Sequence, residues 1–306
     1  MSFPYSTGDV EGQKVLQLVR ATFSSSKILA SANRKLIFVC GGERGQRNLR
    51  SHFLDYLKVN LPDLRIILAE EAYLDILSEG RSTFLNLAVF ENLLADLSDC
   101  IIIFPESRGS VAELGFFVSK NEIAQKLLAV NPLQFQAEES FLNLGPIALV
   151  NERSDFRPTL QIVDQVPPDF TDVAKRLGRI SGPRRRISFP YGSFNKYSSA
   201  EKLFAIFELV RILRLIHAAT LPYTIETIFG DLPDKEEIKH LLSVLVAAKY
   251  VNRVGEDERY LTPSDAPSFL DIPDCNSLII SSNIYLLKNY ISLYSLVFDT
   301  LEAGKC

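Results

Sequence analysis

Apolar segments follow one another in a regular order along residues 35–150. Short apolar runs at 35–40, 64–71 and 100–104 alternate with segments of helical spacing at 48–61, 84–98 and 110–123. We expect further strands at 126–131 and 147–150. Strand–helix alternation is typical of parallel sheets covered by helices on both faces. The sequence therefore predicts an α/β domain over 34–150, built on a doubly wound parallel sheet.

Composition and charge exclude several classes of protein. The chain has 306 residues, enough for two domains, and a net charge of −4, which argues against coating nucleic acid by bulk charge. The polar N-terminus does not resemble a signal peptide, and the apolar segment 278–298 is interrupted by Asn283, Lys288 and Asn289. We therefore expect a cytoplasmic protein without a membrane segment.

No pattern of metal ligands is present. The four cysteines show no CxxC spacing, and the three histidines lie in helical segments without ligand spacing. Cys40 and Cys100 stand beside apolar strands, so we expect them to be reduced core thiols. The prediction is a chain without a metal site.

The rest of the chain has a different pattern. Residues 1–33 read as an N-terminal helical segment, and 151–198 as a basic linker rich in proline, glycine and arginine. Within this linker Arg184, Arg185 and Arg186 either contact phosphates or are solvated. Helices followed by strand, turn and strand over 199–306 predict a winged-helix-like domain. Its would-be recognition helix opens with acidic residues, which repel phosphate and favour a protein-binding role over DNA reading: Asp234, Glu236 and Glu237.

Three segments of the predicted sheet end in polar or glycine-rich turns. Gly41 and Gly42 follow the first strand, Glu70 and Glu71 end the second, and 105–113 follows the third. In parallel sheets ligands bind at the carboxyl ends of the strands. We therefore expect one crevice, whose substrate-binding residues include Gly41, Gly42, Ser107, Arg108, Gly109 and Ser110. Arg108 either meets a phosphate or is solvated.

Two glutamates in the third turn are the candidate catalytic residues. A carboxylate at a helix start can act as a nucleophile, and at an anomeric carbon it would form a glycosyl ester. Glu113 suits this role, with a surface helix residue as the alternative. Glu106 could orient a ribose hydroxyl or act as acid or base; the alternative is a carboxylate that braces the loop.

The residues named so far resemble a known superfamily. Gly41-Gly42 after a strand, and "GSVAELG" after "IIIFPES", are similar to the nucleoside 2-deoxyribosyltransferases. The resemblance is closer to retron-associated effectors with a deoxyribosyltransferase-like domain, and covers about 35–150. It implies a flavodoxin-like sheet, a nucleophile at Glu113, and Arg50 and Glu91 in the crevice. Further shared positions are Asn92, Ser140, Phe141, Asn143, Gly145 and Pro146.

The resemblance also implies a function. Such effectors are toxins that a reverse transcriptase and its multicopy single-stranded DNA, joined to RNA, restrain until phage infection. The implied reaction cleaves an N-glycosidic bond of NAD or a related nucleotide, which is a substrate and not a cofactor. Classical relatives carry an aspartate where this chain has Glu106-Ser107-Arg108. This departure puts base recognition in doubt and favours a phosphate-bearing substrate such as NAD.

Two other classes of function stay open at this point. One is a nucleotide-sensing regulator whose winged helix reads DNA. The other is an assembly partner of a reverse transcriptase with a vestigial active site. A homo-oligomer is also left open by the sequence.

Overall fold

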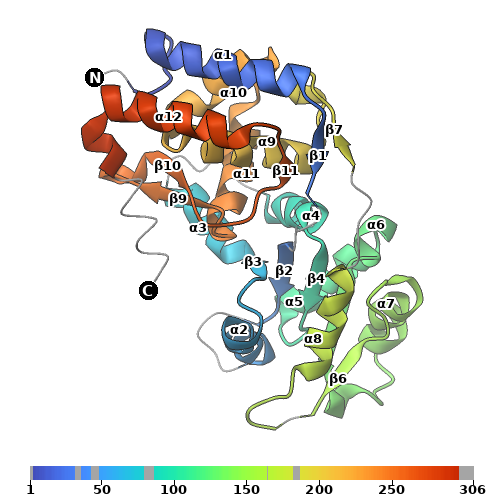
Figure 1. Cartoon of the computed structure of the whole chain (residues 1–306). Helices are drawn as coiled ribbons and strands as arrows, with labels where there is room; N and C mark the ends of the chain where they lie inside the picture. Colours follow the sequence, from blue (N-terminus) through green and yellow to red (C-terminus); the bar gives the residue numbers. More distant parts are fainter. Residues whose placement is uncertain are drawn as a thin grey trace. The chain divides into compact units, whose positions relative to one another are not determined.

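A computed structural model describes residues 3–31, 36–42, 48–78, 86–163, 165–181 and 187–295 (Figure 1). Contacts divide the chain into two compact units. One, the parallel-sheet unit, comprises 35–74 and 81–183; the other, the second unit, comprises 1–34, 75–80 and 184–306.

The parallel-sheet unit is built on five strands in the order β3-β2-β4-β5-β6, with every neighbouring pair parallel. The predicted α/β class with a parallel sheet is therefore confirmed. The strands are β2 (Leu36–Cys40), β3 (Arg65–Ile67), β4 (Cys100–Ile103), β5 (Leu127–Pro132) and β6 (Leu160–Ile162). The α-helices are α2 (Leu49–Asn60), α3 (Ala69–Ser78), α4 (Leu87–Leu97), α5 (Arg108–Val118), α6 (Asn121–Ala124), α7 (Ala148–Arg153) and α8 (Thr171–Leu177).

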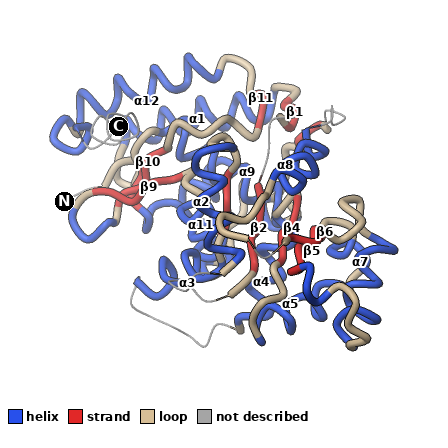
Figure 2. The backbone as a smooth tube through the Cα atoms, turned by 90° about the horizontal axis from the view of Figure 1, so that it is seen from below, coloured by secondary structure: helices blue, strands red, loops and turns tan. Residues whose placement is uncertain are grey.

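Helices cover both faces of this sheet (Figure 2). As a consequence, all five residues of β2 and all four of β4 are buried. On one face the ring of Phe53 in α2 lies 5.2 Å from that of Phe170, which precedes α8. On the other face Phe38 of β2 meets Phe117 of α5, with ring centroids 6.0 Å apart. Each such buried side chain stabilises the fold by about 1.5–3 kcal/mol.

Three segments of this unit differ from the sequence-based expectation. The strand predicted at 64–71 ends at Ile67, and Glu70 and Glu71 lie in the first turn of α3 instead of at the strand end. The strand predicted at 147–150 is wrong, because Asn143–Ile147 form a π-helix that continues into α7. A run of four apolar residues does not distinguish a strand from a turn of buried helix. Conversely, Leu160–Ile162 lie in the segment expected to be a linker but form strand β6, with Val130 of β5 paired to Leu160.

The second unit contains two three-stranded antiparallel sheets, in the orders β11-β1-β7 and β8-β10-β9. Its strands are β1 (Ile28–Ala30), β7 (Ser188–Phe189), β8 (Ile216–His217), β9 (Val251–Val254), β10 (Tyr260–Pro263) and β11 (Leu270–Asp271). Its helices are α1 (Val10–Ser25), α9 (Ser199–Leu213), α10 (Leu221–Phe229), α11 (Lys235–Ala247) and α12 (Cys275–Asn289).

The predicted strand, turn and strand after α11 are present as β9 and β10, with Arg253 opposite Leu261. Helix α9 ends at Leu213, where Arg214 takes a φ of 67°. A positive φ is incompatible with a right-handed helix, and β8 follows. In the part of the chain that the structure describes, no helix is long and apolar enough to cross a membrane.

Candidate active site

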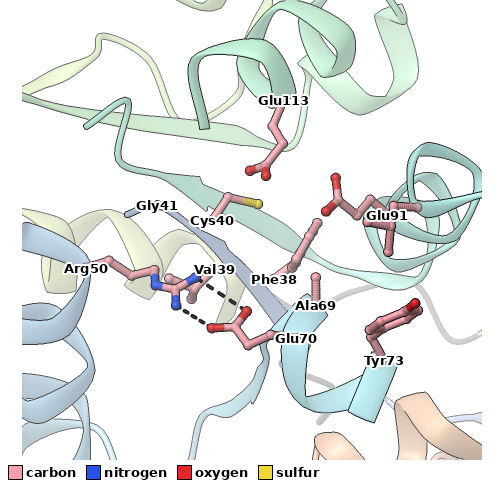
Figure 3. A pocket seen from close by; sticks show the side chains of 11 residues that line it. Phe38, Val39, Cys40, Gly41, Arg50, Ala69, Glu70, Tyr73, Glu91 and Glu113 are labelled. Atoms are coloured by element: carbon pink, nitrogen blue, oxygen red, sulfur yellow. Dashed lines mark hydrogen bonds and ion pairs between the residues drawn. The ribbon is translucent and has the colours of Figure 1, made fainter. Parts of the chain in front are cut away.

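A pocket of about 210 Å³ opens beside the end of β2 (Figure 3). Strand β2 and helices α2, α3, α4 and α5 contribute side chains to it, so segments distant in sequence meet here. The lining residues are Phe38, Val39, Cys40, Gly41, Arg50, Ala69, Glu70, Tyr73, Leu87, Glu91 and Glu113. Of the residues predicted for the site, Gly41, Arg50, Glu91 and Glu113 line this pocket.

The pocket is strongly acidic. Among the described residues that line it are three carboxyl groups, those of Glu70, Glu91 and Glu113, and one cationic side chain, Arg50. The Arg50 guanidinium pairs with Glu70, with Nη1 donating to Oε2 at 3.4 Å and Nη2 donating to Oε1. Arg50 is fixed in place because its side chain is only 8% exposed and its position lies in the first turn of α2.

Helix α5 places Glu113. Ser107 caps the helix, with its Oγ accepting from the Ser110 N–H at 3.1 Å, while the Ser110 Oγ accepts from the Ser107 N–H at 3.0 Å. The Glu113 carboxylate points toward the Cys40 thiol (Figure 3). Burial raises the pKa of Glu113, whereas the hydrogen bond from Cys40 and the charge of Arg50 oppose this rise. The charge of Glu70 adds to the rise, so the pKa of Glu113 stays above its usual value; the side chain is weakly solvated, and its ionised form is the one that can act as a nucleophile.

Glu91 has a different electrostatic environment. It lies on α4, whose N-terminus Asn86 caps by accepting from the Ala88 N–H at 3.1 Å. Burial, together with the charges of Glu113 and Glu70, raises the pKa of Glu91 to about 7. Two carboxyl groups of one pocket thus differ in their surroundings, and a group with a pKa near neutrality can exchange a proton during catalysis.

We expect Glu91 to make the stability of the protein pH-dependent. The pKa of a glutamate in the unfolded chain is 4.5, whereas that of Glu91 in the folded protein is about 7. As pH rises, the unfolded chain therefore loses its proton first. The free energy of unfolding falls as pH rises from about 4.5 to about 7. Glu91→Gln should remove this loss. Because the side chain is partly exposed, solvent screening reduces the gain to about 1–2 kcal/mol at pH 8.

Urea unfolding at pH 4.5 and pH 8 measures this effect. The variant should match the wild type at the lower pH and exceed it at the higher pH. The control is Glu122→Gln, on an exposed position of α6, which should change neither value. An equal stability of Glu91→Gln and the wild type at pH 8 would contradict the assignment.

Glu106 has backbone partners. Its carboxylate accepts from the N–H groups of Gly42 at 3.0 Å, Leu49 at 2.8 Å and Arg50 at 3.1 Å. It therefore caps the start of α2 and fixes the turn after β2. A catalytic role for Glu106 stays a prediction, whereas the contacts that the structure gives it are those of the loop-bracing alternative.

The remaining predicted substrate-binding residues lie around the start of α5. Ser107 and Ser110 cap the helix, and Arg108 and Gly109 are exposed. Gly109 lies near the candidate nucleophile, since a Cβ placed there would be 3.8 Å from Oε1 of Glu113. Cys40 and Tyr73, which also line the pocket, carried no signal in the sequence, whereas Glu70 belongs to one of the three segments expected to converge on the crevice but had no role assigned to it.

Gly42 lies against the cap of α2. A Cβ at this position would be 2.6 Å from Asn48 Nδ2 and 3.3 Å from Glu106 Cγ. We therefore expect Gly42→Val to cost about 1–3 kcal/mol of stability, because the added branch displaces the capping side chains. Thermal unfolding measures this loss. A variant as stable as the wild type, with weakened ligand binding, would instead support contact between Gly42 and the ligand.

The predicted phosphate contacts at Arg184, Arg185 and Arg186 lie outside the described residues. In the described part of the same basic stretch, Arg176 donates to the carbonyl oxygens of Phe156 and Arg157. Arg179 donates to the carbonyl of Asp155 at 3.3 Å. These two arginines therefore hold main-chain carbonyls. Within the described ranges, no cluster of His, Cys, Asp and Glu side chains could hold a metal ion.

A family model described as "STM3845 retron effector protein" matches residues 46–253, which is more than half of the chain. The chain belongs to this retron effector family. The match includes helices α2 to α5, which carry four charged residues of the pocket: Arg50, Glu70, Glu91 and Glu113. The retron effector part of the predicted resemblance is therefore confirmed.

Two curated proteins of Escherichia coli are similar to this retron effector. One is named "Retron Ec86 putative ribosyltransferase/DNA-binding protein" and is 34% identical over 151 residues, 48% of each chain. The other is named "Retron Ec73 putative ribosyltransferase/DNA-binding protein" and is 33% identical over 144 residues, 44% of this chain and 45% of the relative. The chain thus spans about half the length of the curated relatives it matches.

Proposed function

We propose that this retron effector is a toxin of an anti-phage defence system that cleaves an N-glycosidic bond of NAD or a related nucleotide. The observation that carries the proposal is the pocket in which Glu113, beside Cys40 and Arg50, faces a second carboxyl group with a pKa of about 7. Active sites that cleave glycosidic bonds typically use a pair of carboxyl groups in unequal environments. The names of the two relatives, which refer to ribosyl transfer, support the same chemistry.

In the proposed reaction the Glu113 carboxylate attacks the anomeric carbon of the ribose. A C–O bond forms, the C–N glycosidic bond breaks, and its electron pair stays on the ring nitrogen of the leaving base. With NAD the departing nicotinamide becomes neutral without a proton. With an uncharged nucleoside the base takes up a proton, and Glu91, whose pKa is about 7, is a nearby carboxyl group that is partly protonated at neutral pH. Water then resolves the glycosyl ester, or another acceptor takes the sugar.

The charge of the pocket indicates which part of the substrate binds inside it. Among the described residues, three carboxyl groups line the space, of which Glu91 is only partly ionised at neutral pH, and the Arg50 charge is already paired with Glu70. A phosphate would meet net repulsion there, whereas a ribose or a cationic ring would not. We therefore place the sugar and the leaving base in the pocket and the phosphates outside it.

The proposal can be tested in cells. Expression of the chain without its retron partners should deplete NAD or a nucleotide pool and arrest growth, and Glu113→Gln should do neither. Metabolite extraction with base quantification distinguishes the substrates. Growth arrest with unchanged pools of NAD and nucleotides would contradict the proposed reaction.

We propose that a reverse transcriptase and its multicopy single-stranded DNA joined to RNA restrain the effector, which its membership of a retron effector family supports. If Arg184, Arg185 and Arg186 contact phosphates, their replacement by Ala should lower the salt slope of nucleic-acid binding by about 2, from three contacts. Filter binding across a salt series measures the slope. An unchanged slope would assign these arginines to a solvated loop.

The finer fold assignments belong to the same proposal. The order β3-β2-β4-β5-β6 places the first strand of the sheet inside it and the second at its edge, which supports a flavodoxin-like sheet. The succession α9, β8, α10, α11, β9, β10, with antiparallel β8-β10-β9, supports a winged-helix arrangement.

The alternative function is a nucleotide-sensing regulator in which α11 reads DNA, and the words "DNA-binding" in the relatives' names favour it. The charge at the start of α11 does not. Asp234 caps the helix, Glu236 is exposed, and Glu237 pairs with Lys202 at 2.7 Å. We therefore favour protein binding for this region. Tight duplex binding that is lost on replacing exposed residues of α11 would favour the regulator.

A further inference from the structure

Glu70 lines the pocket but has no chemical role in the reaction proposed above. It lies in the first turn of α3, just after β3 ends, and the Arg50 guanidinium holds its carboxylate (Figure 3). The Arg50 side chain is 8% exposed, whereas that of Glu70 is 33% exposed. The pair therefore keeps its cation buried and presents its carboxylate to the pocket.

Close packing fixes the direction in which Arg50 points. Its side chain lies against Gly41 at the end of β2, since a Cβ on Gly41 would be 2.7 Å from Arg50 Cβ and 2.9 Å from Arg50 Cδ. A glycine at this position leaves room for the arginine stem. From there Nη1 donates to Oε2 of Glu70 at 3.4 Å, and Nη2 donates to Oε1. The orientation of the Glu70 carboxylate is thus set by residues of β2 and α2.

The Glu70 carboxylate retains acceptor capacity for a ligand. A carboxylate has about four lone-pair sites on its two oxygens, and from the described part of the chain each oxygen accepts one bond, from Arg50. The charge of Glu70 also reaches the candidate nucleophile, because it raises the pKa of Glu113 as well as that of Glu91. A fixed acceptor therefore lies close to the place where the anomeric carbon would react.

A sugar hydroxyl is the donor that suits this acceptor. The phosphates are placed outside the pocket, and the 2′-hydroxyl is carried by the carbon next to the anomeric carbon. Acidic side chains bind the ribose 2′-hydroxyl in dinucleotide sites, and bonds to this hydroxyl strengthen as the sugar approaches an oxocarbenium ion. A 2′-deoxyribose lacks the donor and would leave the carboxylate facing a methylene group.

We propose that Glu70, positioned by Arg50, accepts a hydrogen bond from the 2′-hydroxyl of the substrate and selects ribonucleotides over 2′-deoxyribonucleotides. Arg50 acts through Glu70 and is a positioning residue. The inference rests on the proposed glycosidic cleavage and adds the class of sugar that the pocket accepts. It departs from the resemblance to the deoxyribosyltransferases, whose name refers to a 2′-deoxy sugar.

Release of base from matched ribose and 2′-deoxyribose substrates tests the inference. ATP is paired with dATP, and NAD with its analogue that lacks the 2′-hydroxyl on the nicotinamide ribose. The ratio of kcat/KM between the two sugars is measured for each protein. The intrinsic reactivity of the sugars differs, but this difference cancels when variants are compared. Glu70→Gln replaces a charged acceptor with a neutral one, so the ribose-to-deoxyribose ratio should fall about 10-fold.

A second variant tests the positioning by Arg50. Arg50→Lys keeps the positive charge but cannot hold both carboxylate oxygens in a fork, so it should also lower the ratio. Glu122→Gln, on an exposed position, should keep the wild-type ratio. If both pocket variants slow the two sugars equally, the ratio is unchanged; this overturns the inference while the proposed reaction stands. Release from neither sugar by the folded wild type overturns the reaction and the inference with it.

Discussion

Glu113→Gln is expected to abolish glycosidic cleavage and toxicity while the protein stays folded. The amide keeps the shape of the side chain and can still accept a hydrogen bond from Cys40, but it lacks the anionic oxygen that would attack the anomeric carbon. Loss of a nucleophile costs on the order of 1000-fold or more in turnover. Stability should not fall, because the substitution removes one of three carboxylates that share the pocket.

Single-turnover release of free base measures this effect, with urea unfolding as the check on folding. Glu122→Gln repeats the substitution on an exposed helical position of the same unit and should retain full activity. A Glu113→Gln variant that cleaves at near the wild-type rate would show that another residue is the nucleophile. If the variant lost activity because it unfolded, the loss would say nothing about the nucleophile. Base release and urea unfolding are therefore measured on one preparation.

Glu106→Gln is expected to have the opposite outcome: a large loss of stability. Both Glu106 carboxylate oxygens accept main-chain hydrogen bonds, from Gly42, Leu49 and Arg50. A glutamine has one oxygen, and its amide group would face backbone N–H donors. Losing charge-assisted bonds at a helix start and leaving buried donors without an acceptor should cost about 3 kcal/mol.

The two glutamine substitutions lie seven residues apart and form a matched pair. Denaturant unfolding should rank Glu106→Gln well below the wild type and Glu113→Gln at or above it. Residual activity of folded Glu106→Gln, measured at low temperature, then separates a bracing role from a catalytic one. Full stability with lost turnover would restore Glu106 as a catalytic residue.

Most strands of the parallel sheet could be predicted from the sequence, but fewer of the residues that line the pocket could be. Strands β2 and β4 could be predicted because both are buried on both faces and therefore consist of continuous apolar runs. Gly41 marks the end of β2. The segment 147–150 could not be assigned from the sequence, because four consecutive apolar residues fit a short strand or one turn of helix, and in the helix only Ile147 and Val150 of the four are buried. Strand β6 has three residues, too few for a period to be recognised.

Long-range contacts explain what was missed at the site. Glu70 becomes important only through its pairing with Arg50, twenty residues earlier. Likewise the high pKa of Glu91 comes from burial and from charges on two other helices. Glu106 shows the same limit in reverse: its position in a loop between strand and helix fits catalysis and capping equally, and only the backbone partners distinguish them.

Release of base by the purified protein is the direct test of glycosidic cleavage by Glu113. The full chain is incubated separately with NAD, with ribonucleotides and with deoxyribonucleotides, and free nicotinamide or nucleobase is quantified by chromatography. We expect release from at least one of these substrates by the wild type and by Glu122→Gln, and none by Glu113→Gln. Absence of free base from all of them with a folded wild type, or release that is unchanged in Glu113→Gln, would contradict it.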